Sequence, residues 1–135
     1  ITDHPHIVHE DYQMDPVPFY HLMDLFLFLT KREGFGNVSA EAALTGIPVI
    51  AADVTGARDT LLDGETGYLV DPDSHEDVMD KLNTLISDPV LRKALGAAGQ
   101  EWVRQNFSNE TIWEEMDHYY RSCLLERSSV LGEAQ

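Results

Sequence analysis

Two glutamates flank a short, glycine-containing segment of this sequence. Residues Arg32–Ala42 read REGFGNVSAEA, so Glu33 and Glu41 stand eight positions apart. Gly34 and Gly36 leave room for the backbone to approach a ligand and to adopt conformations that bulkier residues avoid. The composition of this segment is typical of a ligand-binding turn rather than of a core segment.

The chemistry of such a turn comes from main-chain donors and carboxylates. The N–H groups of Phe35–Val38 are free to face outward, and the first turn of a helix from Asn37 would add free donors and partial positive charge. These donors suit a diphosphate. Glu33 and Glu41 would repel phosphate on contact, so we expect them to accept hydrogen bonds from hydroxyl groups on either side. A ligand with hydroxyls, then phosphates, then hydroxyls is a nucleoside diphosphate sugar.

The neighbouring segments predict where this turn lies in the fold. Asp24–Leu29 is a short, almost fully apolar run, typical of a strand covered on both faces in a parallel sheet. Val38–Thr45 predicts a helix, Gly46 ends it, and Ile47–Ala51 predicts the next buried strand. The motif therefore follows the carboxyl end of a strand, where open α/β sheets bind ligands. The fold class is α/β, a Rossmann-like parallel sheet with flanking helices.

The rest of the chain is interpreted as scaffold. A turn at Asp63–Gly67 precedes a short strand at Tyr68–Val70. Three helices follow, the first capped by Ser74, the second starting at Asp88-Pro89 and the third capped by Ser108. Their predicted apolar faces comprise, in turn, Val78, Leu82 and Leu85; Leu91, Leu95, Ala98, Trp102 and Val103; and Ile112, Met116, Tyr119, Tyr120 and Leu124.

The spacing of the two glutamates resembles the glutamate, seven residues, glutamate motif of retaining glycosyltransferases of family 4, whose domains have the GT-B architecture. The resemblance covers nearly the whole chain, in the family's order. Besides the motif, the segments that carry it are Val17–Met23, Asp24–Leu29, Ile47–Asp59, Asp63–Asp71 and Asn106–Ser108.

The resemblance implies a role for each motif residue. The implied donor-binding residues are Glu33, Gly34, Phe35, Gly36, Asn37, Val38 and Glu41. Glu33 would contact hydroxyls of the transferred sugar and stabilise the positive charge that develops on it, while the backbone of 34–36 contacts the same sugar. The amides of Asn37 and Val38 would lie near the diphosphate, and Glu41 would bind the ribose. The family transfers sugar with retention, generally without a metal, and the leaving phosphate helps to deprotonate the acceptor.

The resemblance also implies parts that this sequence lacks. A full enzyme has two such domains, with an acceptor saccharide or lipid-linked acceptor between them. The chain opens at Ile1, and Ile7–Glu10 resembles the third strand of the second domain, so we expect the first domain to be missing. Lys31 and Arg32 do not match the family's upstream basic pair. We therefore expect weak donor affinity and no activity from this chain alone.

Composition sets further limits. With 135 residues and 43% hydrophobic content, residues 1–135 are expected to form a single domain, with a flexible tail at 128–135. A net charge of −15 argues against nucleic acid or an anionic membrane surface as a partner. Cys123 is the only cysteine and is expected to pack as a free thiol, which favours a cytoplasmic protein, with membrane-peripheral placement open for the full-length protein.

Several side chains have two interpretations. His4, His6 and His9 with Glu10 and Asp11 offer metal ligands, but their spacing matches no standard site, and a polar loop entering a strand is favoured. Asp53 and Thr55-Gly56 either face the ligand cleft or cap a loop and helix. Tyr12 either stacks near the nucleobase or packs on the surface.

Alternatives remain for assembly and function. We expect Ile7–Glu10 to pair beside Leu25–Leu29 or with the edge of another molecule. Exposure of Trp113, Tyr119 and Tyr120 would favour self-association. Two other functions stay open: a GT-B phosphorylase or sugar epimerase fragment, and a non-catalytic α/β interaction module whose glycines serve only the fold.

Overall fold

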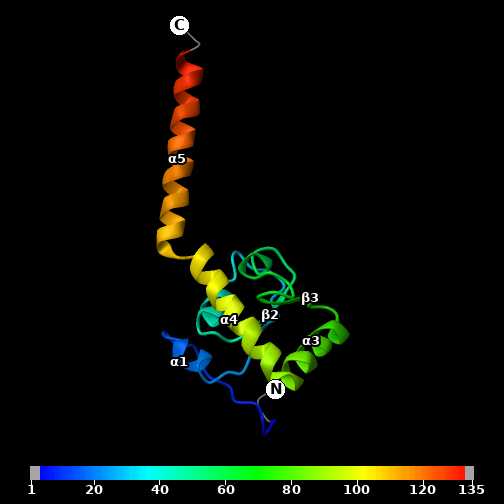
Figure 1. The fold of residues 1–135 in the computed structure, drawn as a ribbon. Helices are drawn as coiled ribbons and strands as arrows, with labels where there is room; N and C mark the ends of the chain where they lie inside the picture. The colour runs from blue at the N-terminus through cyan, green and yellow to red at the C-terminus, as the bar shows by residue number, and fades with distance from the viewer. Residues whose placement is uncertain (1–3, 133–135) are drawn as a thin grey trace.

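A computed structural model describes residues 4–132 of the chain. At its centre is a parallel sheet of three strands in the order β1-β2-β3, with β1 at Phe26–Phe28, β2 at Val49–Ala52 and β3 at Gly67–Val70 (Figure 1). Phe26 is opposite Val49, and Val49 is opposite Gly67. The strands are parallel, so their carboxyl ends lie at one edge of the sheet, as the sequence predicted.

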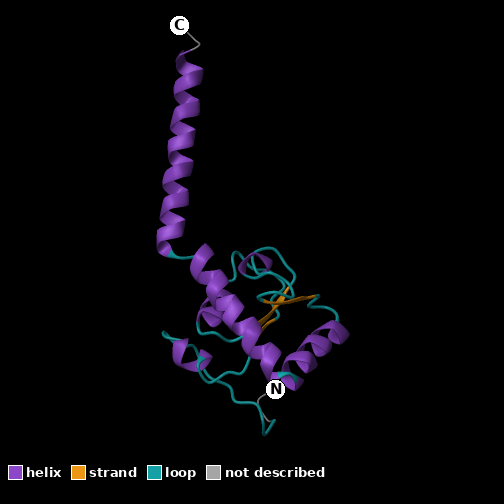
Figure 2. Cartoon of the chain, in the orientation of Figure 1, coloured by secondary structure: helices purple, strands orange, loops and turns teal. Residues whose placement is uncertain are grey.

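Helices connect and flank these strands (Figure 2). Their bounds are α1 Val17–Tyr20, α2 Asn37–Leu44, the 3₁₀ helix η1 Arg58–Thr60, α3 His75–Ser87, α4 Pro89–Asn106 and α5 Asn109–Gly132. The family resemblance implies a helix over Val17–Met23, but α1 ends at Tyr20, and the residues after it form turns in which Leu22 N donates to Phe19 O and Met23 N donates to Tyr20 O.

The core lies on both faces of β2, all four residues of which are buried. Val49 and Ala51 pack on one face with α2, whose Ala42 and Ala43 are buried there. Ile50 packs on the other face with α3, chiefly through Leu85. Helix α4 contributes to both clusters. The structure is therefore an α/β sheet with flanking helices, and β2 is covered on both faces. The double coverage predicted for the strand in Asp24–Leu29 is wrong, because β1 is an edge strand among residues 4–132 and Leu27 is 38% exposed.

The predicted helix starts are confirmed. Ser74 Oγ accepts a hydrogen bond from Asp77 N at 3.2 Å, and Asp88 Oδ1 accepts from the first-turn amides of α4, where proline occupies the first position. Ser108 Oγ accepts from Thr111 N at 3.1 Å. These caps satisfy amides that would otherwise lack a partner.

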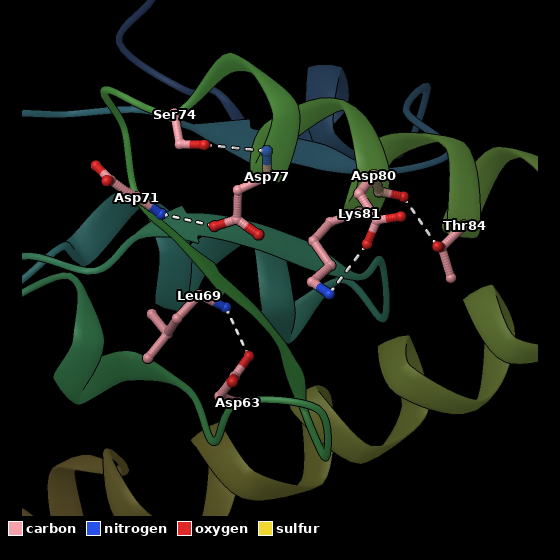
Figure 3. A network of polar contacts seen from close by, with 8 residues as sticks. All are labelled: Asp63, Leu69, Asp71, Ser74, Asp77, Asp80, Lys81 and Thr84. Atoms are coloured by element: carbon pink, nitrogen blue, oxygen red, sulfur yellow. Dashed lines mark hydrogen bonds and ion pairs between the residues drawn. The ribbon is translucent and has the colours of Figure 1, made fainter.

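A network of aspartates joins β3 to α3 (Figure 3). Asp63 Oδ1 accepts from Leu69 N, and Asp77 Oδ2 accepts from Asp71 N, each at 2.9 Å. The side chains of Asp63 and Asp77 therefore stabilise the turn before β3 and the connection after it.

The predicted strand at Ile7–Glu10 is wrong for the chain by itself. The segment is irregular, Val8 is 83% exposed, and β1 pairs only with β2 within residues 4–132. A strand needs a partner for its backbone groups, and the predicted pairing beside Leu25–Leu29 does not form. Pairing with the edge of another molecule stays a prediction.

Helix α5 projects away from the rest of the structure (Figure 1). Trp113, Tyr119 and Tyr120 are 68%, 65% and 58% exposed, so the apolar face predicted for this helix is uncovered at Tyr119 and Tyr120, and self-association stays a prediction. The side chains of Cys123 and Leu124 lie outside the described residues. Of the tail expected at 128–135, the backbone is helical to Gly132, and 133–135 also lie outside them. Within residues 4–132, no helix combines the length and apolar character that crossing a bilayer requires.

A close helix approach holds α4 against the end of α2. A Cβ built on Gly96 would lie 2.1 Å from the carbonyl oxygen of Gly46, so the two backbones leave no room for a methyl group. The predicted apolar face of α4 did not include this residue. Because Gly96 has no Cβ, α4 can pack directly against the backbone of Gly46.

Gly96→Ala is expected to lower the free energy of unfolding by about 2 kcal/mol, because the clash outweighs the roughly 1 kcal/mol that alanine adds to helix propensity. Chemical denaturation measures the change. Ala97→Gly, at the exposed neighbouring position, changes only helix propensity and should lower the free energy of unfolding by about 1 kcal/mol. A Gly96→Ala protein more stable than the parent chain would contradict the close approach.

Candidate functional site

The glycine-containing turn leaves the carboxyl end of β1 and enters α2. Gly36 is the N-cap of α2 in a left-handed conformation, with φ 77°, and no side chain caps the helix. Its carbonyl oxygen accepts from Ser39 N and Ala40 N. Among residues 4–132, no acceptor is recorded for the N–H groups of Asn37 and Val38. These two amides therefore form a donor pair at the positive end of a helix.

Glu33 turns back onto this loop. Its Oε1 accepts a hydrogen bond from Gly34 N at 2.9 Å. The carboxylate is thus held beside the turn, and its other oxygen remains available to a ligand.

The space beside Gly34 is open. A Cβ built on this residue would meet no heavy atom within 4 Å, and its φ is not positive. Neither packing nor backbone conformation therefore requires glycine at this position. That a ligand approaches the backbone here stays a prediction.

Phe35 joins the turn to the end of α4. Its ring lies edge-to-face with that of Phe107, with ring centroids 5.1 Å apart and planes at 74°. Phe107 is the C-cap of α4 and is followed by the Ser108 cap of α5. The start of α5 is consequently packed close to the candidate site.

Glu41 lies one turn into α2 and has a partner that the sequence analysis missed. Its Oε2 accepts a hydrogen bond from the hydroxyl group of Tyr20 in α1 at 3.1 Å. Tyr20 is 4% exposed, and burial, followed by the Glu41 carboxylate, raises its pKa to about 12. Twenty-one positions separate the two residues, so no local pattern could have revealed the contact.

The structure does not bring all predicted site residues to one cavity. Glu41 lines a hollow between α1, α2 and α4 whose other walls are Val17, His21, Leu44, Thr45, Gln100 and Arg104. Glu33 is not among its lining residues. A shared cavity for the two carboxylates stays a prediction.

Two basic side chains near the turn, Lys31 and Arg58, are paired with aspartates, whereas Arg32 has no ion pair among residues 4–132. Lys31 Nζ pairs with Asp73 at 2.5 Å, and Arg58 Nε pairs with Asp53 Oδ1 at 3.0 Å. The sequence analysis did not include Arg58 among the candidate site residues. Its position in the loop after the carboxyl end of β2 could have indicated that it lies near the site. Asp53 thus binds a neighbouring arginine rather than capping a helix.

The remaining sequence candidates are placed as follows. Tyr12 is 89% exposed, so the expected surface packing is wrong, and a role beside a nucleobase stays a prediction. His4 and His6 contact each other at 5.6 Å between ring centroids. Within residues 4–132, no three His, Cys, Asp or Glu side chains are grouped closely enough to hold a metal ion.

Comparison with known proteins identifies the family. The profile described as Glycosyl transferases group 1 matches residues 1–102, and the chain belongs to this family. The capsular polysaccharide biosynthesis glycosyltransferase CapM of Staphylococcus aureus is 42% identical over 126 residues, which cover 93% of this chain and 33% of CapM. A GDP-mannose-dependent alpha-(1-6)-phosphatidylinositol monomannoside mannosyltransferase of Mycolicibacterium smegmatis is 38% identical over 105 residues, covering 72% of this chain and 28% of that protein.

A solved structure agrees on the fold. Anabaena HepE, crystallised in complex with UDP-glucose, matches with a TM-score of 0.72 and 28% identity over 80% of this chain and 30% of HepE. The sheet and its helices are therefore part of a GT-B glycosyltransferase fold. The chain spans about a third of the length of these three proteins.

Removal of the Tyr20 hydroxyl group tests its contact with Glu41. Because the folded chain holds the phenol neutral to about pH 12, while an unfolded tyrosine ionises near pH 10, this group's contribution to stability is full below pH 10 and is lost between pH 10 and 12. Tyr20→Phe should lack that loss and should cost about 1.5 kcal/mol at neutral pH. Denaturation of both proteins across this pH range measures the difference; identical pH profiles would contradict the raised pKa that burial and the Glu41 carboxylate give Tyr20.

Proposed function

We propose that this chain is the donor-binding part of a retaining glycosyltransferase of family 4, which transfers a sugar from a nucleoside diphosphate sugar to an acceptor. The observation that carries the proposal is the free donor pair of Asn37 and Val38 at the uncapped start of α2. Two further features support it. Carboxylates flank the pair in sequence, and the backbone beside Gly34 is open to a ligand.

Each group has a chemical task in this proposal. The amides of Asn37 and Val38 bind the diphosphate, and the backbone of Gly34–Gly36 contacts the sugar. Glu33 accepts hydrogen bonds from sugar hydroxyls through the oxygen that Gly34 N does not occupy. Glu41 accepts from the ribose hydroxyls, while the Tyr20 hydroxyl group holds its carboxylate in place.

The reaction breaks the bond between the anomeric carbon and the diphosphate oxygen. Negative charge grows on the leaving phosphate, where the two amides and the α2 dipole stabilise it, and positive charge grows on the sugar near Glu33. The acceptor hydroxyl oxygen bonds to the anomeric carbon with retention, and its proton passes to the leaving phosphate. No metal is required in this scheme.

The whole protein's activity needs groups beyond this chain. With a net charge of −15 and with Lys31 and Arg58 already paired, the chain offers a diphosphate little positive charge beyond Arg32, so we propose weak donor binding and no transfer by the chain alone. A second domain would supply the binding site for an acceptor saccharide or lipid-linked acceptor. The names of the relatives support a role in polysaccharide or glycoconjugate synthesis, and a cytoplasmic or membrane-peripheral setting is part of the proposal.

No specific observation favours the phosphorylase, epimerase or interaction-module alternatives. UDP and GDP are the first ligands to test, because a relative and a solved structure name them.

Titration of the ¹⁵N-labelled chain with UDP, GDP and their sugar conjugates tests donor binding. We expect the largest amide shifts at Asn37 and Val38, and roughly tenfold weaker binding for Glu41→Ala. Tyr20→Phe keeps the carboxylate but removes its hydrogen bond, so it should weaken binding less than Glu41→Ala does. Absence of binding at millimolar concentrations of all four ligand types would contradict donor binding by this chain.

Gly34→Ala separates ligand approach from folding. The added methyl group would meet no protein atom, so stability should change by less than about 0.5 kcal/mol. It would occupy the space that the sugar needs, so the affinity for a sugar conjugate should fall about tenfold while that for the free diphosphate changes less. Equal sugar-conjugate affinity in calorimetry would show that the sugar does not approach Gly34.

A further inference from the structure

The loop after β2 lies in backbone contact with the candidate donor loop. Gly56 has φ 86°, and a Cβ built on it would lie 2.5 Å from Gly34 O and 2.7 Å from Glu33 O. A side chain at this position would collide with the main chain of the turn that carries the donor-binding groups. Only glycine allows the two loops to approach so closely and to adopt this conformation.

The contact is reciprocal at Gly36. A Cβ built on Gly36 would lie 3.3 Å from both Ala57 Cα and Thr60 Cγ2, and 3.4 Å from Gly56 O. Ala57 is fully buried, and Thr60 is 2% exposed. The N-cap of α2 is therefore packed directly against the loop after β2.

That loop is itself held firmly. Thr60 Oγ1 donates to Ala57 O at 2.7 Å, and Arg58 N donates to Val54 O at 3.1 Å. Asp53 N donates to Val70 O at 2.8 Å, which ties the start of the loop to the end of β3. Residues 53–60 thus form a braced support that is anchored to the sheet, whereas Gly34 has open space beside it.

We propose that residues 53–60 position the donor site, with Gly56 and Thr60 as positioning residues that set the direction of the Asn37 and Val38 amides. The inference rests on the proposed function. Gly36 is both the residue that this loop contacts and the residue that immediately precedes the two amides. A displacement of the turn by about 1 Å would point the Asn37 and Val38 amides away from the ligand, and hydrogen bonds weaken when their geometry is lost.

The chain offers a matched control for the strain of a left-handed position. Gly64 has φ 74°, and a Cβ built there would meet no atom within 4 Å. Gly64→Ala therefore introduces the same type of backbone strain as Gly56→Ala without touching the donor loop. Thr60→Ser is a milder variant, because it removes the methyl group that contacts Gly36 and keeps the hydroxyl group that bonds to Ala57.

The first measurement is made on the ligand-free, ¹⁵N-labelled 135-residue chain. Gly56→Ala and Thr60→Ser should shift the amide resonances of residues 33–38 and speed their hydrogen exchange, whereas Gly64→Ala should leave those resonances unchanged. If Gly56→Ala does not fold, Thr60→Ser decides the outcome. Unchanged resonances at 33–38 in a folded Thr60→Ser chain, or equal shifts in Gly64→Ala, would overturn the positioning role.

The second measurement is titration of the same proteins with UDP and GDP. We expect Gly64→Ala to bind as the parent chain does, Thr60→Ser several-fold more weakly and Gly56→Ala at least tenfold more weakly. Parent-like affinity in a folded Thr60→Ser or Gly56→Ala chain would overturn the inference while leaving donor binding intact. Failure of the parent chain to bind would instead overturn the proposed function, whatever the ligand-free spectra show about the loop contact.

Discussion

The contact between two loops at the carboxyl edge of the sheet is the constraint on which the candidate site depends. Gly56 and Gly36 both have positive φ, and each faces the main chain of the other's loop. Because α2 begins at this contact, the directions of its first free amides follow from it. A hydrogen bond from Asp53 N to Val70 O ties residues 53–60 to the sheet, so the position of the site depends on the core.

A strongly acidic chain that binds an anion needs donors without side-chain charge. Main-chain amides at a helix start meet this need, since their partial charge is fixed by the backbone and does not depend on lysine or arginine. Part of the acidic charge serves structure, as Asp63, Asp77 and Asp88 accept hydrogen bonds from backbone amides. The proposed anion binding and a net charge of −15 are therefore compatible.

Local patterns predicted the local structure. Apolar runs predicted β1 and β2, and the residues adjacent to Ser74 and Ser108 predicted that these serines cap helices. The failures involve contacts that local sequence does not reveal. Ile7–Glu10 has strand composition but pairs with no strand within residues 4–132. The Tyr20–Glu41 hydrogen bond and the Gly56–Gly34 contact join residues far apart in sequence, so no periodic pattern of residues indicates them. The motif indicated which residues could bind a donor, but it could not indicate what holds them.

A crystal structure of this chain with UDP or GDP bound is the most direct test of the central claim. The account predicts diphosphate oxygens about 2.7–3.2 Å from the amide nitrogens of Asn37 and Val38, with Gly36 still packed against Gly56 and Thr60. A diphosphate bound elsewhere, with these two amides left facing solvent, would contradict it.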